Sequence, residues 1–245
     1  MERSDGMLVY GVNPVMEALK AGAVKKIFVS AKRQDIPDIL GLAAKLGVPV
    51  ERVAPSFFEA LPKGHQAVAA KVREKSFAGT GEMLDAAVRL GETPLLVALD
   101  GVEDPRNLGA IMRSALALGA HGIIIGKHRQ SGLTPEAFKA SAGAAWSLPV
   151  SREANIKYAL DLLKEKGLVI AGTIAGSGMA PWQADLREPL VLVLGGEGAG
   201  LRRVVAERCD YLLSIPMRGL DSLNVSVSAG IILSEVLRQR SSKKP

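Results

Sequence analysis

A predicted strand, a loop and a predicted helix follow one another in the sequence Leu95-Leu-Val-Ala-Leu-Asp-Gly-Val-Glu-Asp-Pro-Arg-Asn-Leu-Gly-Ala-Ile-Met-Arg113. The apolar run 95–99 is typical of a strand that is buried on both faces. The helix is predicted over Asn107–Leu118, with Gly119 as its stop signal. A second apolar run at Gly122–Ile125 completes a β-α-β unit. Such units predict a mostly parallel sheet with helices on both faces, and hence an α/β fold.

The same alternation continues toward the C-terminus. Further strands are predicted at residues 148–150, 168–171, 190–194 and 212–215, and further helices after Thr134-Pro135 and at residues 155–166, 201–208 and 222–240. We therefore expect residues 94–245 to form one domain.

A smaller α/β unit is predicted for residues 1–73. Its strands are predicted at residues 7–10, 26–29, 50–53 and 66–72. Asn13-Pro14 predicts the start of one helix, and Ser56 with Glu59 fits a capping box at the start of another. Residues 74–93 are expected to form a linker and a short helix at 82–90.

Bulk composition excludes several classes of protein. The net charge of +6 indicates either a polyanionic partner or ordinary solubility. Cys209 is the only cysteine, which excludes an intrachain disulfide and a Cys-based zinc site. The three histidines lack metal-ligand spacing, so no metal is expected. No secretory leader is visible, and no apolar run approaches the roughly 20 residues that span a bilayer. We expect a cytoplasmic protein that does not enter the membrane.

Three polar residues follow predicted strands: Asn107, Glu197 and Asn224. In an open α/β sheet, ligands bind beyond the carboxyl ends of the strands. The three loops are therefore expected to converge on one site.

The loop Gly195-Gly-Glu-Gly-Ala-Gly200 lets the backbone turn sharply and approach a ligand closely. It does not fit the dinucleotide motif G-x-G-x-x-G, because Leu201 stands where the third glycine belongs. The carboxylate of Glu197 would also repel a pyrophosphate. A neutral or cationic ligand suits the loop better; the alternative is a turn that only reverses the chain.

Arg113 has no acidic residue three or four positions away, so no intrahelical ion pair explains it. It is a candidate for binding a phosphate or carboxylate, and the alternative is a solvated arginine whose stem covers apolar surface. Ser222 and Asn224 open the last predicted helix, where either a helix cap or a ligand contact would explain them.

Three segments together resemble the SpoU (TrmH-type) family of RNA ribose 2′-O-methyltransferases, within the SPOUT superfamily and most like its 23S rRNA guanosine subgroup. They are Asn107…Arg113, Gly196-Glu197-Gly198 and Ile215-Pro216-Met217…Ser222-Leu223-Asn224, and the resemblance covers residues 94–240. Residues 11–19 and 65–68 resemble the RNA-binding domain of the ribosomal subgroup. The C-terminal loop departs from the pattern, because two residues, Leu220 and Asp221, stand where the subgroup has three.

The resemblance implies a C-terminal trefoil knot, a homodimer and S-adenosyl-L-methionine as cofactor. It implies that Arg113 acts as the catalytic group on the ribose 2′-hydroxyl. It also implies that four further residues shape the site or hold Arg113 and the RNA: Asn107, Glu197, Ser222 and Asn224. The implied cofactor-binding residues are Thr173, Gly176, Leu194, Gly195, Gly196, Gly198, Ile215, Pro216, Met217 and Leu223.

The predicted function is therefore methyl transfer to a guanosine ribose of 23S rRNA. A tRNA ribose methyltransferase and a non-catalytic RNA-binding protein are the alternatives. A dinucleotide-dependent enzyme is disfavoured by the missing glycine motif.

Overall fold

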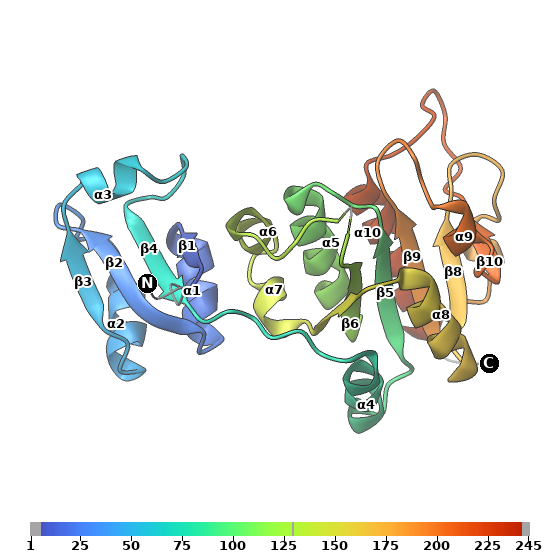
Figure 1. The fold of residues 1–245 in the computed structure, drawn as a ribbon, viewed down its shortest axis with the longest axis horizontal. Helices are drawn as coiled ribbons and strands as arrows, with labels where there is room; N and C mark the ends of the chain where they lie inside the picture. The colour runs from blue at the N-terminus through green and yellow to red at the C-terminus, as the bar shows by residue number, and fades with distance from the viewer. Residues whose placement is uncertain (1–5, 129, 242–245) are drawn as a thin grey trace.

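The computed structural model describes residues 6–128 and 130–241, which form two β-sheets with flanking helices (Figure 1). The first sheet has the strand order β1-β4-β2-β3. β4 pairs antiparallel with β1 and β2, and β2 pairs in parallel with β3. The elements of this first unit are β1 (Leu8–Tyr10), α1 (Val12–Lys20), β2 (Val24–Ser30), α2 (Pro37–Lys45), β3 (Val50–Val53), α3 (Ser56–Glu59) and β4 (Val68–Val72).

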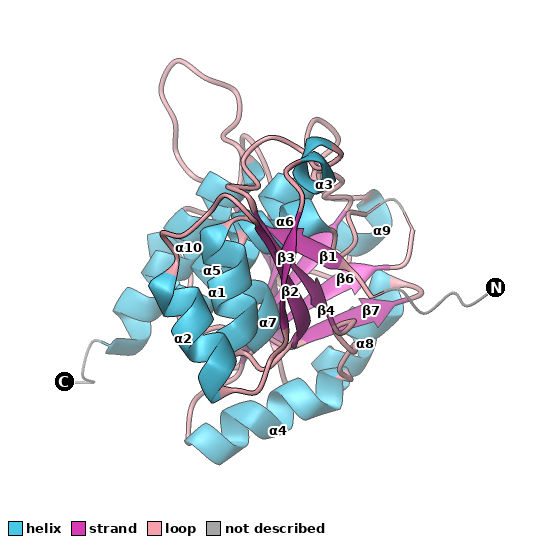
Figure 2. Ribbon diagram, turned by 90° about the vertical axis from the view of Figure 1, so that its left-hand side faces the viewer, coloured by secondary structure: helices cyan, strands magenta, loops and turns pink. Residues whose placement is uncertain are grey.

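Helices cover the first sheet unequally. Figure 2 shows α1 and α2 side by side along one side of these strands. Leu19 of α1 and Ile39 of α2 are buried in the same cluster as Ile27 of β2. Phe58 of α3 packs with Tyr10 in a smaller cluster elsewhere in the unit.

The second sheet has six strands in the order β10-β8-β9-β5-β6-β7, and every pair is parallel. The α/β class with a covered parallel sheet is thus confirmed. The elements are α4 (Thr80–Leu90), β5 (Leu95–Asp100), α5 (Pro105–Ala117), β6 (Gly122–Gly126), α6 (Pro135–Ala140), α7 (Ala144–Ser147), β7 (Val150–Glu153), α8 (Ile156–Glu165), β8 (Val169–Thr173), a 3-10 turn (Pro181–Gln183), β9 (Leu190–Gly195), α9 (Arg203–Ala206), β10 (Tyr211–Leu213) and α10 (Val225–Ser241).

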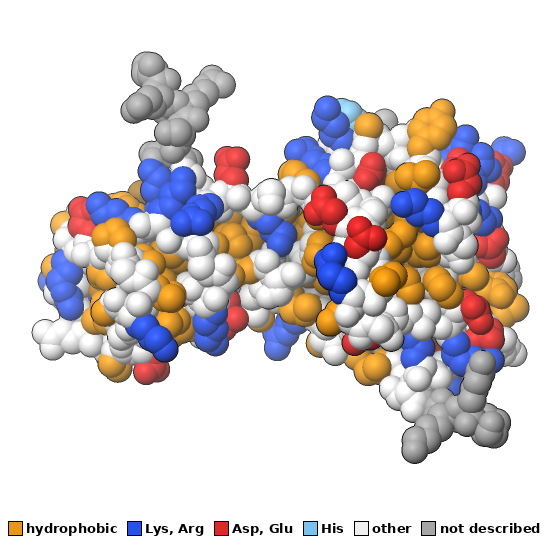
Figure 3. Space-filling model, turned by 90° about the horizontal axis from the view of Figure 1, so that it is seen from below, with side chains coloured by type: hydrophobic (Ala, Val, Ile, Leu, Met, Phe, Trp, Pro, Cys, Tyr) orange, Lys and Arg blue, Asp and Glu red, His pale blue; other side chains and the backbone are white. Residues whose placement is uncertain are grey.

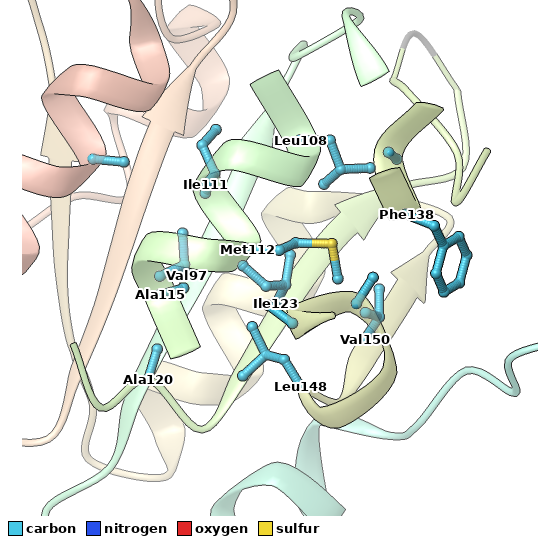
Figure 4. Close-up of a cluster of buried hydrophobic side chains, with 14 of the residues drawn as sticks. Val97, Leu108, Ile111, Met112, Ala115, Ala120, Ile123, Phe138, Leu148 and Val150 are labelled. Atoms are coloured by element: carbon cyan, nitrogen blue, oxygen red, sulfur yellow. The ribbon is translucent and has the colours of Figure 1, made fainter. Parts of the chain in front are cut away.

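Strand β5 supplies buried side chains to both faces of this sheet. Val97 joins a cluster with Ile111 and Met112 of α5, which Figure 4 shows in close-up. The next residue, Ala98, joins a separate cluster with Leu160 of α8. This alternation explains why the strand reads as a continuous apolar run.

The predicted linker is docked on the second unit. The amide of Ala78 donates to the carbonyl of Val150 at 2.8 Å, beside the edge strand β7. Lys75 donates to the carbonyl of Trp146 at 3.0 Å. The linker therefore covers the β7 end of the sheet.

Helix α6 packs against elements of both units. Gly109 of α5 allows the close approach of α6, because a Cβ there would lie 2.4 Å from the carbonyl oxygen of Ala137. On the other side, the Lys139 ammonium lies 5.4 Å from the centre of the Tyr10 ring. Burial and the nearby Glu136 carboxylate raise the pKa of Tyr10.

The end of α10 is fastened to the loops before β5 and β9. The guanidinium of Arg240 donates to the carbonyls of Thr93, Pro94 and Glu188 at 2.6, 3.1 and 2.8 Å. In the part of the chain that is described, no helix combines the length and the apolar character of a membrane span. The trefoil knot stays a prediction.

Helix starts are where the sequence predictions were wrong. Helix α1 begins at Val12, whose amide donates to the side chain of Gln66 at 2.9 Å, so Asn13 does not cap it. Ser56 forms no capping box, because the residue before α3 is Pro55 and no side chain caps the helix. Helix α9 is only four residues long and α10 begins at Val225, three residues later than predicted. A contact distant in sequence, which local patterns do not contain, satisfies the start of α1, whereas α10 is capped locally by Asn224.

Candidate functional site

A cavity of about 640 Å³ lies at the carboxyl ends of β8, β9 and β10, beside the first turns of α5 and α10. The loops that surround it lie above the second sheet in Figure 1. Four segments far apart in sequence line it. They contribute Asp104, Arg106 and Asn107; Thr173, Ile174 and Ala175; Gly195, Gly196, Glu197, Gly198 and Gly200; and Leu213, Ile215, Met217, Ser222, Leu223, Asn224, Val225, Ser228 and Ile232.

Hydrogen bonds link the three polar residues singled out in the sequence. Asn107, 8% exposed, donates from Nδ2 to the Glu197 carboxylate. Asn224 donates from its own Nδ2 to Oδ1 of Asn107 at 3.1 Å. The side-chain oxygen of Asn224, Oδ1, accepts from the backbone amide and the hydroxyl of Ser226 at 2.9 and 2.6 Å. Asn224 therefore serves both as a helix cap and as a partner of the buried amide.

The glycine loop is packed against the protein itself. A Cβ on Gly195 would lie 2.3 Å from the backbone carbon of Gly200, and one on Gly196 would lie 1.9 Å from the carbonyl oxygen of Gly101. These two glycines are explained by close backbone contact within the chain. The loop nevertheless does more than reverse the chain, since it presents Glu197 beside the cavity.

The loop after β8 is held by the segment that follows β10. Ser214 donates from Oγ to the carbonyl of Gly176 at 2.7 Å, and Ile174 donates from its amide to the carbonyl of Leu213 at 2.9 Å. Thr173 is half-buried and lines the cavity, whereas Gly176 does not line it.

The predicted residues of the last loop divide in a similar way. Ile215, Met217, Ser222 and Leu223 line the cavity, whereas Pro216 does not. Leu194 is fully buried in the core, so only its backbone could reach a ligand.

Arg113 lies apart from the cavity of its own chain. Its side chain is exposed, and it forms no ion pair or hydrogen bond with the described residues. It follows Arg106, which lines the cavity, by seven residues, so it lies on the same side of α5 roughly 10 Å along the helix. The assignment of a catalytic role to Arg113 stays a prediction.

Asp104 and Arg106 are site residues that the sequence analysis missed. Asp104 caps α5 by accepting from the Arg106 amide at 2.8 Å, and the two side chains form an ion pair at 3.0 Å. The hydrogen bonds from Arg106 lower the pKa of Asp104 below its ordinary value. An Asp followed by Pro105 at the first helical position was the available signal.

The lining of the cavity combines apolar and charged side chains. Over residues 6–128 and 130–241, no group of three His, Cys, Asp or Glu side chains could hold a metal. Apolar walls from Ile215, Leu223 and Ile232 face the cavity together with the Glu197 carboxylate. This combination suits a ligand with an apolar part and a positive charge.

Two protein-family models match the chain. The model described as the SpoU rRNA Methylase family matches residues 94–234, which is more than half of the chain. The model described as RNA 2′-O ribose methyltransferase substrate binding matches residues 8–78.

The chain is also similar to individual proteins of this kind. The TrmH-family protein YacO of Bacillus subtilis, named among the tRNA/rRNA methyltransferases, is 39% identical over 237 residues, 95% of each chain. The crystal structure of the SpoU methyltransferase AviRb from Streptomyces viridochromogenes, in complex with AdoMet, superposes with a TM-score of 0.85 at 30% identity and covers 99% of this chain and 93% of its own. The AdoMet-bound rRNA methyltransferase from Sinorhizobium meliloti superposes with a TM-score of 0.78 at 27% identity and covers 98% and 89%.

Proposed function

The chain belongs to the SpoU rRNA methylase family of RNA 2′-O-ribose methyltransferases, and we propose that it methylates a guanosine ribose of 23S rRNA with S-adenosylmethionine as donor. The observation that carries this proposal is the hydrogen-bonded set Glu197–Asn107–Asn224 at the edge of the 640 Å³ cavity. It places a carboxylate and two amides where three loops meet.

The cavity fits the proposed cofactor on three counts. Its volume of about 640 Å³ lies within the range of about 300–1,000 Å³ that is usual for cofactor pockets. Its glycine loop lacks the phosphate-binding pattern, and S-adenosylmethionine has no phosphate. Its Glu197 carboxylate is complementary to a positive charge. When bound, the cofactor supplies a methyl group that its sulfonium makes electrophilic.

The residues around the cavity have distinct proposed roles. Backbone groups of Thr173, Gly195, Gly196 and Gly198 would hold the cofactor, together with the side chains of Ile215, Met217 and Leu223. Asn107, Ser222 and Asn224 would fix Glu197 and orient the ribose. Most of the rate gain would come from this positioning.

Arg113 is proposed to bind the phosphate next to the target ribose and to polarise the 2′-hydroxyl. A guanidinium is a permanent cation in proteins. As a permanent cation, it is better suited to bind an anion than to remove a proton.

A homodimer is part of the proposal, since it gives Arg113 a cavity to act on. Helices α5 and α10 pack together and leave several large apolar side chains open to solvent: Leu116, Val227, Ile231 and Leu237 are 41%, 49%, 40% and 42% exposed. Burying such side chains against a second copy is favourable. Arg113 lies on the same pair of helices, and we propose that it acts at the cavity of the partner.

The first unit is proposed to hold the RNA. It matches the substrate-binding model over residues 8–78. Figure 3 shows Lys and Arg side chains on the surface of this unit. The full-length likeness to an rRNA methyltransferase favours ribosomal over transfer RNA. We place the reaction in the cytoplasm, where such RNA is assembled into ribosomes.

Methyl transfer to RNA from cells lacking this protein tests the proposal. The purified protein is incubated with labelled S-adenosylmethionine and either rRNA or tRNA, and the 2′-O-methylated nucleotides are mapped. Label on a guanosine of 23S rRNA is expected. Label on tRNA alone would move the substrate to that class. RNA binding without any transfer would favour a non-catalytic RNA-binding protein.

A further inference from the structure

Asp100, the last residue of β5, is the only carboxylate that is buried among residues 6–128 and 130–241, with 1% exposure. It does not line the 640 Å³ cavity. A buried carboxylate is unfavourable unless hydrogen bonds and an opposite charge compensate it. Its partners therefore indicate why it is there.

Every partner of Asp100 outside the sheet belongs to the glycine loop or to the residues that end it. The carboxylate accepts from the backbone amide of Arg202 at 2.8 Å and from the Nε of Arg202 at 2.6 Å. Its carbonyl oxygen accepts from the amide of Gly196 at 2.8 Å. A single residue thus fastens both ends of the segment Gly196–Arg202.

The fastened segment has little freedom to change shape. Gly200 donates from its amide to the carbonyl of Gly196 at 3.0 Å, which closes the loop on itself. Close backbone contact leaves no room for a side chain at Gly196. Glu197 lies at the tip, so its position relative to Asn107 follows from how the two ends are held.

Arg202 is the residue before α9. Its backbone is extended, with φ −62° and ψ 142°, and its amide donates to the carboxylate of Asp100. The contact therefore lies where the glycine loop ends and α9 begins.

We propose that Asp100, through Arg202, is a positioning residue that sets the glycine loop and thereby the Glu197 carboxylate for cofactor binding and catalysis. The inference rests on the proposed function, because the loop lines the cavity assigned to S-adenosylmethionine. Asp100 acts through the loop and does not itself touch the cavity. Loss of the Asp100–Arg202 ion pair should therefore displace the Glu197 carboxylate, although Glu197 itself is unchanged.

Two variants disrupt the Asp100–Arg202 ion pair in different ways. Asp100→Asn removes the charge and turns an NH₂ group toward the donors of Arg202. Arg202→Met keeps the backbone amide bond but removes the guanidinium, and it should fold readily because that side chain is 53% exposed. Arg203→Met is the matched control, since the neighbouring arginine is 91% exposed and forms an ion pair with Glu207 on its own helix.

Calorimetric titration with S-adenosylmethionine and the side-chain amide NMR signals of Asn107 are measured for all four proteins at a temperature where each is folded. Asp100→Asn is expected to weaken binding by about tenfold or more, since a lost charged hydrogen bond has at least this effect. Arg202→Met is expected to weaken binding less. Both variants should shift the Asn107 signals, and Arg203→Met should not.

The outcomes separate this inference from the proposed function. If folded Asp100→Asn and Arg202→Met bind S-adenosylmethionine like the wild type and leave the Asn107 signals in place, the Asp100–Arg202 pair has only a structural role and the inference is wrong. The NMR signals report the effect of this pair on the Asn107 side chain without any ligand. If the wild type itself does not bind S-adenosylmethionine, the proposed function fails instead.

Discussion

The side-chain amide of Asn107 donates a hydrogen bond to the carboxylate of Glu197, although 90 residues separate the two in the sequence. The same amide accepts from Asn224, a further 27 residues along the chain. Because one amide donates and accepts at once, it can join the loops after β5 and β9 to the start of α10. A carboxylate or an apolar side chain at position 107 could not do both.

Replacement of Asn107 by Asp should therefore disable the enzyme without unfolding it. Asn107→Asp places a second carboxylate against Glu197, and like charges repel at this distance. We expect kcat/KM for methyl transfer to fall about 100-fold, each tenfold step corresponding to about 1.4 kcal/mol. Asn155→Asp, at the cap of α8, is the control, because Asp caps helices as well as Asn does. Wild-type activity in Asn107→Asp would contradict the role given to this amide.

Replacement of Arg113 by Lys distinguishes two roles for its guanidinium. A lysine still offers a positive charge to a phosphate. If Arg113 binds phosphate, Arg113→Lys should keep most of kcat and raise the KM for RNA. Collapse of kcat at an unchanged KM would instead make the guanidine a direct participant in proton removal. Steady-state kinetics with saturating S-adenosylmethionine measure both constants.

Mixed dimers show whether Arg113 acts at the partner's cavity. Arg113→Ala and Glu197→Ala proteins should each be inactive. In a randomly mixed population, half of the dimers are hybrids, and each hybrid has one site with both residues. Remixing should then restore about a quarter of the wild-type activity. If Arg113 serves its own chain, no hybrid site is complete and the mixture stays inactive.

Burial of Lys75 in the linker should make the free energy of unfolding depend on pH. Burial lowers the pKa of Lys75 to about 8, compared with about 10.4 for an unfolded lysine. Below pH 8 the folded state carries a partly desolvated ammonium, which lowers stability. As pH rises from about 8 to about 10.4, the unfolded state binds more protons, so the free energy of unfolding rises.

Relative to Lys75→Met, the wild type should therefore gain on the order of 2 kcal/mol over this range of pH. Urea unfolding at several pH values measures the difference. Lys45→Met, at the exposed end of α2, serves as the control. Parallel pH profiles for the wild type and Lys75→Met would show that the Lys75 side chain is not desolvated in the folded protein.

The sequence patterns predicted the sheet and the meeting of the loops, because both follow from regular features. The apolar run at 95–99 is buried on both faces, as its lack of alternation indicated. Asn107, Glu197 and Asn224 meet because parallel strands deliver their loops to one edge of the sheet.

Features that depend on distant partners could not be predicted. The amide of Arg202 donates to the carboxylate of Asp100, 102 residues away, and the start of α1 is satisfied by Gln66. The sequence pattern predicted that Gly195 and Gly196 let the backbone approach a ligand. Their lack of a Cβ is explained instead by close contact of Gly195 with Gly200 and of Gly196 with Gly101. Helical spacing places Arg113 on the same side of α5 as Arg106, but which turn of the helix borders the cavity emerged only in three dimensions.

Calorimetric titration of the wild-type protein with S-adenosylmethionine, and in parallel with NAD, tests the central claim most directly. We predict saturable binding of S-adenosylmethionine and none of NAD. Gly196→Ala should abolish the binding, because its Cβ would lie 1.9 Å from the carbonyl oxygen of Gly101. Absence of any S-adenosylmethionine binding by folded wild-type protein would contradict the assignment of this cavity.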